Sequence, residues 1–211
     1  MGNILPKQFL LLAGRPVFLH ALDRIARCPA VDEIVVVAPR GQEDRLRSLM
    51  PEESSKPVRI VPGGENRQES VRLGLEAVSE DSEMILIHDA VRPCVETDRI
   101  EALIDVVRES GAAVLAVPVK DTLKRVESGR IVETVDRGNL WQVQTPQGFR
   151  ADWIRMAHDR ACEEGWTATD DAALVEHLGH PVRGVLGDPR NIKITTPEDL
   201  VLAEKLMGSG T

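Results

Sequence analysis

The sequence has 211 residues, enough for one domain with a single sizeable core, and its 42% apolar and 28% charged residues are ordinary for a globular protein. No apolar run approaches the roughly 18 residues that a membrane-spanning helix needs, and the N-terminal residues lack the basic and apolar regions of a signal peptide. A net charge of −8 and 3% aromatic residues argue against a polynucleotide partner, which requires a broad basic face and rings for base stacking.

The cysteines and the charge also bear on where the protein works and what it binds. Three widely separated cysteines with no CxxC pair are typical of reduced thiols, so we expect a cytoplasmic protein without a structural zinc. A few converging lysine and arginine side chains can still form a local positive pocket on an acidic protein. The composition therefore leaves a small anionic ligand open.

Short apolar runs alternate with amphipathic stretches along the chain, which is typical of βαβ units. Because the run from 34 to 38 is apolar throughout, we expect it to be a strand covered on both faces. No linker, repeat or low-complexity tract marks a second domain, so residues 1–211 are predicted to form one α/β domain with a mainly parallel twisted sheet. The runs that predict its strands are Ile34–Ala38, Val58–Val61, Met84–His88 and Ala112–Val117.

Helical spacing appears between these runs. Apolar residues recur at i, i+3, i+4 and i+7 from 100 to 107, which predicts a helix. Asp98 and Glu101 are spaced as a capping pair at its start, and Gly111 is placed to end it. The last helix is predicted to begin at 196–197, where a threonine cap precedes a proline in the first turn.

One segment, about 119–138, breaks this alternation. It holds two β-like runs, 122–126 and 131–135, joined by Glu-Ser-Gly-Arg, which predicts a β-hairpin inserted in the α/β domain. A two-stranded hairpin is only marginally stable alone. We therefore expect this arm to pack against another surface, such as a second subunit.

Polar residues follow two of the predicted strands, at the edge where open α/β sheets bind ligands. The segment 62–70 places two glycines after a strand and before a helix, so that backbone N–H groups can approach an anion; the alternative is a glycine turn with a helix cap. The segment 88–93 contains Asp89, which could hold a metal or hydroxyl groups, and Arg92, which could bind a phosphate. Its alternative is a salt-bridged strand end.

Two further polar clusters lie later in the chain. In 136–147, Arg137 and Thr145 could donate hydrogen bonds to a phosphate, although a lone arginine beside a hairpin is usually a solvated charge. In 188–197, Lys193 interrupts a short apolar run that reads as a strand. Its burial is costly unless the ammonium meets a negative partner, and the alternative is an edge-strand lysine that resists aggregation.

The sequence shows no Ser–His–acid spacing and no HExxH motif, so anion-binding groups outnumber candidates for acid–base catalysis. Phosphoryl and nucleotidyl transfer need that balance, because they rest on positioning and charge neutralisation. Several short motifs follow one another along the chain and form a specific series. They are Pro6–Leu10, Gly63–Ser70, His88–Pro93, Asp121–Lys124, Thr134–Arg137, Leu140–Trp141, Gln144–Gln147 and Asn191–Lys193. The series resembles the 2-C-methyl-D-erythritol 4-phosphate cytidylyltransferases of the non-mevalonate isoprenoid pathway, over nearly the whole chain.

The resemblance implies a Rossmann-like nucleotidyltransferase fold and a homodimer whose hairpin arms interlock. It also implies Mg²⁺, with CTP and methylerythritol phosphate as substrates, and a CDP-linked alcohol and pyrophosphate as products. We therefore expect small-molecule partners, no nucleic acid and no membrane.

The resemblance also assigns roles to matching residues. Those implied for CTP are Gly64, Glu65, Arg67, Ser70, Asp89 and Ala90, with Asp89 as a weaker candidate near the metal. Those implied for methylerythritol phosphate are Arg92, Thr122, Thr145, Thr169 and, from the partner's arm, Arg137. Catalysis is implied for Lys7 and Lys193, which would flank the α-phosphate and stabilise the charge that develops there.

The sequence departs from the family at its front. Family members place an apolar strand and a glycine-rich loop before Pro-Lys-Gln, and here Met1-Gly2 falls where that loop would end. Without that strand, two neighbouring strands would face each other with unpaired backbone groups, each costing about 1–3 kcal/mol. We hypothesise that the native chain starts upstream.

Two alternative functions remain. A ribitol 5-phosphate cytidylyltransferase belongs to the same superfamily, but the run 134–147 looks more like the methylerythritol enzymes. A non-catalytic nucleotide-binding homodimer would fit the absent loop. The non-catalytic alternative does not explain four basic residues, because a decayed site has no reason to keep them. These residues are Lys7, Arg92, Arg137 and Lys193.

Overall fold

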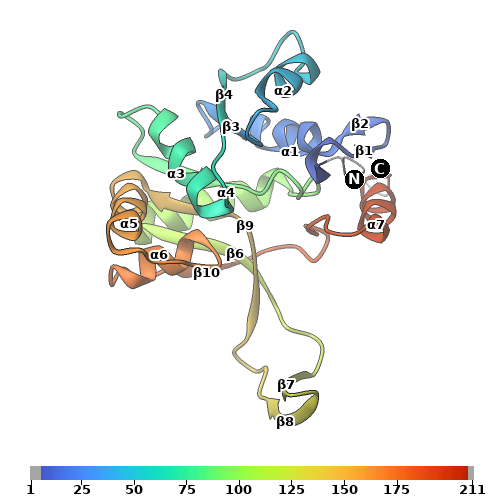
Figure 1. Ribbon diagram of the computed structural model, residues 1–211, viewed down its shortest axis with the longest axis vertical. Coiled ribbons are helices and arrows are strands. Elements are labelled where there is room, and N and C mark those ends of the chain that lie inside the picture. Colours follow the sequence, from blue (N-terminus) through green and yellow to red (C-terminus); the bar gives the residue numbers. More distant parts are fainter. Residues whose placement is uncertain (1–5, 209–211) are drawn as a thin grey trace.

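Strands β6 (Ala112–Pro118) and β9 (Trp141–Arg150) form the centre of a four-stranded sheet in the computed structural model, which describes residues 6–208 (Figure 1). The strand order is β10-β6-β9-β5, where β10 spans Arg183–Leu186 and β5 spans Met84–Ile87. β10 runs parallel to β6, whereas β9 runs antiparallel to both of its neighbours. The sheet is therefore mixed, with one reversed strand between parallel ones.

A second, two-stranded sheet stands apart from the first. Its strands β3 (Ile34–Ala38) and β4 (Val58–Pro62) are parallel and pair in register. Within residues 6–208, β3 pairs with β4 alone and β5 pairs with β9 alone. Each of these two strands thus has one edge without a ladder partner among the described residues.

Helices cover both faces of the larger sheet, as predicted. Ala113 and Leu115 of β6 pack against α4, while Ala112 and Val114 pack in a second cluster with α5 and α6. Successive strand residues point to opposite faces, so the two clusters lie on opposite sides of β6. The helices are α1 (Val17–Ala26), α2 (Glu43–Leu49), α3 (Arg67–Ala77), α4 (Thr97–Ser110), α5 (Ala151–Glu164), α6 (Asp171–His177) and α7 (Pro197–Gly208).

The predicted hairpin is the arm that leaves the body in Figure 1. Its strands are β7 (Leu123–Glu127) and β8 (Arg130–Val135), paired antiparallel. The connecting residues Ser128 and Gly129 both have positive φ, 48° and 78°, as a two-residue hairpin turn requires. The short elements η1 (Lys7–Phe9), β1 (Leu11–Leu12) and β2 (Arg15–Pro16) begin the described chain.

Most predicted elements are confirmed, and the exceptions have physical reasons. The run around Lys193 is a loop rather than a strand, because its backbone bonds to another loop: the Ile194 N–H donates to the Val91 carbonyl at 2.9 Å. Asp98 lies inside the first turn of α4 and not at its cap, which is Glu96. Gly111 does end that helix, with φ 86°.

Strand β3 is also less covered than expected. Four of its five residues are only half-buried, because the edge that faces β5 has no neighbouring strand. No helix between residues 6 and 208 is both long and apolar enough to cross a membrane.

Candidate active site

A cavity of about 230 Å³ opens at the carboxyl end of β5, and we call it the Asp89 cavity. It brings together side chains that lie more than a hundred residues apart in the sequence. Six of the residues predicted for the substrates or for catalysis line it, namely Arg67, Asp89, Arg92, Thr145, Thr169 and Lys193. The other lining residues are Val143, Gln144, Gln147 and Asp170.

The Asp89 carboxylate lies at the centre of the cations. Its Oδ2 atom is 2.9 Å from Nζ of Lys193 and 3.8 Å from Nε of Arg92, and its Oδ1 atom accepts a hydrogen bond from Nε of Arg67 at 3.2 Å. Burial raises the pKa of the Asp89 carboxyl, but the hydrogen bonds and charges of Lys193 and Arg67 outweigh burial and hold it below its ordinary value. Asp89 is therefore ionised at neutral pH and holds the cations in place.

Arg67, the first residue of α3, is held from both sides. Besides Asp89, it pairs with the buried Asp171, whose Oδ2 is 2.8 Å from Nη2 of Arg67. Asp171 is 1% exposed, and its other oxygen is 3.1 Å from Nε2 of His158, which is also buried. Burial lowers the pKa of Arg67, but Asp171 and Asp89 together raise it above the ordinary value. These contacts keep the guanidinium charged and fixed beside the cavity.

Lys193 and Arg92 come from two loops that bind each other. Nη1 of Arg92 donates to the Asn191 carbonyl at 2.8 Å, and Nδ2 of Asn191 donates to the Thr145 carbonyl at 2.8 Å. Gln144 adds a hydrogen bond from Nε2 to the Asp188 carbonyl at 2.8 Å. Burial lowers the pKa of Arg92, an effect that Asp89 partly offsets, so its guanidinium stays charged at neutral pH. These bonds bring Lys193 to the end of β5.

His88 packs behind the cavity and takes no part in acid–base chemistry there. Its Nε2 atom is 3.1 Å from the Arg92 carbonyl, which can only accept, so Nε2 carries the hydrogen. Its Nδ1 atom then accepts from the Thr145 hydroxyl at 3.2 Å, and that hydroxyl accepts the Asp89 N–H at 3.0 Å. Burial lowers the pKa of His88 to about 4, so the ring is neutral at pH 7.

The glycine segment forms a turn that leads into the start of α3. A Cβ on Gly63 would lie 2.8 Å from the Ala38 carbonyl, so only glycine allows this close approach. The Gly64 N–H donates to the Ser70 hydroxyl at 3.1 Å, and the Glu65 N–H donates to the Glu69 carboxylate at 2.6 Å. These groups form a turn and a helix cap; Gly64 and Glu65 do not line the Asp89 cavity.

The remaining predicted residues are not brought to this cavity. Lys7 is exposed in η1, and Thr122 and Arg137 are exposed on the arm. Ser70 and Ala90 line a larger cavity next to it. The buried residues Asp171 and Asn191 support the cations but received no role from the sequence. Neither Asp171, the first residue of α6, nor Asn191, in a loop, lies in a pattern that signals burial.

The protein side chains do not form a magnesium site by themselves. Across residues 6–208, no three His, Cys, Asp or Glu side chains gather closely enough to hold a metal ion. Both oxygens of Asp89 are already engaged by Arg67 and Lys193. The described residues therefore supply no protein site for the metal that was expected near Asp89.

An α/β sheet whose strand end gathers three cations around one carboxylate defines a class of proteins that bind phosphate-bearing ligands and transfer groups between them. Comparison with known proteins identifies the family within that class to which the chain belongs. The family model for 2-C-methyl-D-erythritol 4-phosphate cytidylyltransferase matches residues 1–209. The chain belongs to this family.

Individual relatives agree with the family match. The 2-C-methyl-D-erythritol 4-phosphate cytidylyltransferase of Geotalea uraniireducens is 45% identical over 99% of this chain and 91% of its own. The crystal structure of the enzyme of that name from Thermus thermophilus is 38% identical, with a TM-score of 0.83, over 95% of this chain and 93% of that one. The 4-diphosphocytidyl-2C-methyl-D-erythritol synthase of Anaerococcus prevotii is 30% identical, with a TM-score of 0.88, over 98% and 92%.

Proposed function

We propose that the protein transfers CMP from CTP to 2-C-methyl-D-erythritol 4-phosphate, giving the CDP-linked alcohol and pyrophosphate in the cytoplasm. Membership of the family supports this reaction. One observation about this chain indicates which residues would carry it out. Arg67, Arg92 and Lys193 converge on Asp89 in a single cavity, although they lie on three separate segments. This is a site at which two phosphate groups can be held together.

In the proposed reaction, a phosphate oxygen of the alcohol phosphate attacks the α-phosphorus of CTP in line. A P–O bond forms to that oxygen, the bond to the bridging oxygen breaks, and pyrophosphate leaves with the electron pair. Negative charge increases on the α-phosphate oxygens as the bond forms. Lys193 is half-exposed and 2.9 Å from Asp89, so its Nζ atom can turn towards these oxygens and stabilise the charge.

The acceptor phosphate would be held by Arg92, Thr145 and Thr169, which line one cavity. The Thr145 hydroxyl already receives the Asp89 N–H, so its position is fixed before the substrate binds. We propose that Gly64, Glu65, Ser70 and Ala90 border the nucleoside of CTP, since the segment from 63 to 70 follows β4 and runs into the first turn of α3, next to Arg67.

A second copy of the chain completes the proposal. The two strands of the arm expose large apolar side chains, which a partner subunit would cover. The exposed fractions are 56% for Val126, 66% for Ile131 and 50% for Val132. We propose a homodimer in which the arm of one protomer brings Thr122 and Arg137 to the acceptor of its partner. Lys7 is proposed to join Lys193 at the α-phosphate, and Mg²⁺ to be held chiefly by the triphosphate oxygens.

Measuring pyrophosphate release from CTP with different acceptors tests this function. We expect rapid release with methylerythritol phosphate and release at least a hundredfold slower with ribitol 5-phosphate. Faster release with ribitol 5-phosphate would make that alternative the function. CTP binding by calorimetry with no release from either acceptor would favour the non-catalytic homodimer.

A further inference from the structure

The segment between α5 and α6, residues 165–170, carries Thr169 into the Asp89 cavity, and we call it the Thr169 loop. It begins at Gly165, which ends α5 with φ 70°, a left-handed conformation that favours glycine. Helices α3, α5 and α6 lie at the same end of the molecule, so the loop runs close to the start of α3 (Figure 1). Thr169 itself is exposed. Packing does not fix an exposed side chain, so its position depends on the residues on either side of it.

The side chain of Gln68, the second residue of α3, binds this loop with both atoms of its amide group. Its Nε2 atom donates to the Trp166 carbonyl at 2.9 Å, and its Oε1 atom accepts the Ala168 N–H at 3.1 Å. One side-chain amide thus bonds to a backbone acceptor and to a backbone donor, as a neighbouring strand would. These bonds hold the loop up to the residue before Thr169.

The residue after Thr169 is held from another direction. The Asp170 carboxylate caps α6 by accepting the Ala173 N–H at 3.0 Å, and it accepts a hydrogen bond from Nε2 of Gln147 at 2.8 Å. Thr169 therefore lies between two fixed points. Gln68 supplies the one on its amino-terminal side, and β9 and α6 supply the other.

Gln68 directly follows Arg67, and these two residues hold opposite ends of the same stretch of chain. Arg67 pairs with Asp171, the first residue of α6, at 2.8 Å, and donates to Asp89 at 3.2 Å. Arg67 is the residue proposed above for CTP, and Thr169 is one of those proposed for the acceptor phosphate. The first turn of α3 therefore sets how far the two substrate-binding groups lie from each other.

We propose that Gln68 is a positioning residue for the acceptor phosphate, because its amide holds the Thr169 hydroxyl towards the cavity that Arg92 also lines. This inference rests on the proposed function. Gln68 does not itself line the Asp89 cavity, so it acts through the loop. Without its amide, water would replace both bonds and the loop could shift. A shift of about 1 Å in a positioning group is enough to weaken its contact with a substrate substantially.

The test replaces Gln68 with methionine, which has nearly the same length and is unbranched but can form neither bond. We expect Gln68→Met to raise the KM for the alcohol phosphate about tenfold, while kcat and the KM for CTP change by less than about twofold. Gln42→Met is the matched control, since Gln42 is also half-buried next to a helix start and its side chain makes no capping bond. It should leave all three constants unchanged.

A double-mutant cycle tests whether Gln68 acts through Thr169. Thr169→Ala alone should raise the KM for the alcohol phosphate about tenfold, and adding Gln68→Met should raise it by less than about twofold more, because coupled changes are not additive. Gln68→Glu keeps an acceptor for the Ala168 N–H and should have a smaller effect than Gln68→Met. It takes the place of Gln68→Met if that variant does not fold.

Hydrogen exchange without substrates reports the contact itself. The amide of Ala168 should exchange about tenfold faster or more in Gln68→Met, because its acceptor is lost. Wild-type protein without turnover would refute the proposed function, and the exchange rate would still test the contact. Normal wild-type turnover with an unchanged KM in Gln68→Met would overturn this inference alone. Equal rises of both KM values, or a further tenfold rise in the Thr169→Ala background, would also overturn it.

Discussion

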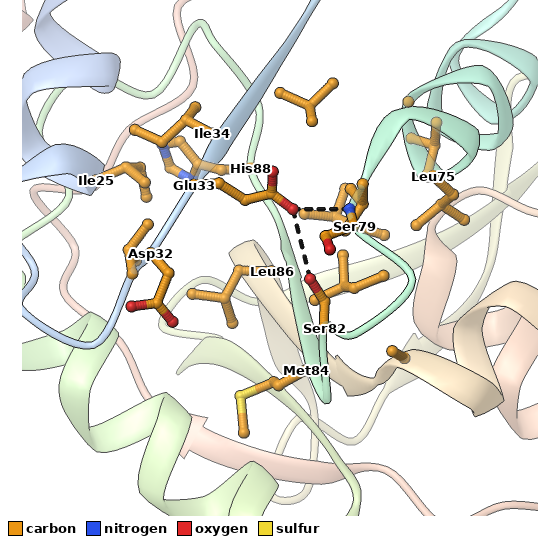
Figure 2. Close-up of a pocket in the computed structure, with 18 of the residues that line it drawn as sticks. Ile25, Asp32, Glu33, Ile34, Leu75, Ser79, Ser82, Met84, Leu86 and His88 are labelled. Carbon is orange, nitrogen blue, oxygen red and sulfur yellow. Dashed lines mark hydrogen bonds between the residues drawn. The ribbon is translucent and has the colours of Figure 1, made fainter. Parts of the chain in front are cut away.

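Arg67 and Asp89 line both the Asp89 cavity and the larger cavity of about 1500 Å³ between β3 and β5 (Figure 2), yet the two spaces differ in what surrounds them. In the Asp89 cavity the charged side chains are held by one another, through contacts such as Lys193 with Asp89 and Arg67 with Asp171. In the larger cavity the side chains of the two flanking strands are mainly apolar and belong to the packed core clusters. The first space can therefore recognise an anionic ligand by its charge.

The largest expected effect breaks the Asp89 cavity alone. Lys193→Ala should lower kcat by about 10²–10³, because it removes a donor that stabilises charge in the transition state. Steady-state kinetics would measure this, with Arg40→Ala as a control for loss of an exposed cation. The variant should fold normally. Near-normal turnover would remove Lys193 from the mechanism.

The next effect concerns His88, which lines the larger cavity and contacts Thr145 of the Asp89 cavity. Its pKa falls from about 6.5 unfolded to about 4 folded, so the folded state resists protonation. Stability from this group is fully present above pH 6.5 and is lost as pH falls towards 4, by about 2–3 kcal/mol. Urea unfolding at pH 4 to 7 should show this slope, and His88→Gln should flatten it. An unchanged slope in the variant would mean that other groups titrate.

Asp171 tests whether buried support is needed for the charged cavity. Asp171→Asn should lower the free energy of unfolding by about 1–3 kcal/mol, because it weakens the contacts to Arg67 and His158. It should also weaken CTP binding, since Arg67 loses a fixed partner. Chemical denaturation and calorimetry would measure both, with the exposed Asp159→Asn as the matched control. Equal stability of the two variants would contradict this role.

The smallest effect lies outside both cavities, on the arm. Arg137→Ala should raise the KM for the alcohol phosphate about tenfold while leaving that for CTP nearly unchanged, because a hydrogen bond to a charged group contributes about 1.5–3 kcal/mol. Arg130→Ala, an exposed arginine on the same arm, is the control. Equal changes for both substrates would place Arg137 elsewhere.

The same contrast explains what the sequence could predict. The strands β3 to β6 follow from apolar runs, and the arm follows from its turn residues. Strand β9 was missed because Gln144 and Gln147 interrupt its apolar pattern. Their side-chain amides are buried against the Asp188 carbonyl and the Asp170 carboxylate, which lie elsewhere in the chain. The run around Lys193 was wrongly predicted as a strand, because its backbone bonds to the loop at Val91 and not to a strand.

The site depended even more on tertiary contacts. No local pattern indicates that Lys193 meets Asp89, since the loops that join them are held by Asn191 and Thr145. The resemblance to a family assembled six residues that the structure places around one cavity. It could not indicate that Asp171 is buried behind Arg67, because that contact requires α3 and α6 to be packed.

Phosphorus NMR of a mixture of the protein, CTP, Mg²⁺ and methylerythritol phosphate tests the central claim most directly, because it observes the bond that forms. We expect the CTP signals to be replaced by two coupled diphosphate resonances of the CDP-linked alcohol and by pyrophosphate in equal amount. Persistence of the CTP and alcohol phosphate signals, with CTP bound to the protein, would contradict the assignment of the Asp89 cavity as a site of CMP transfer.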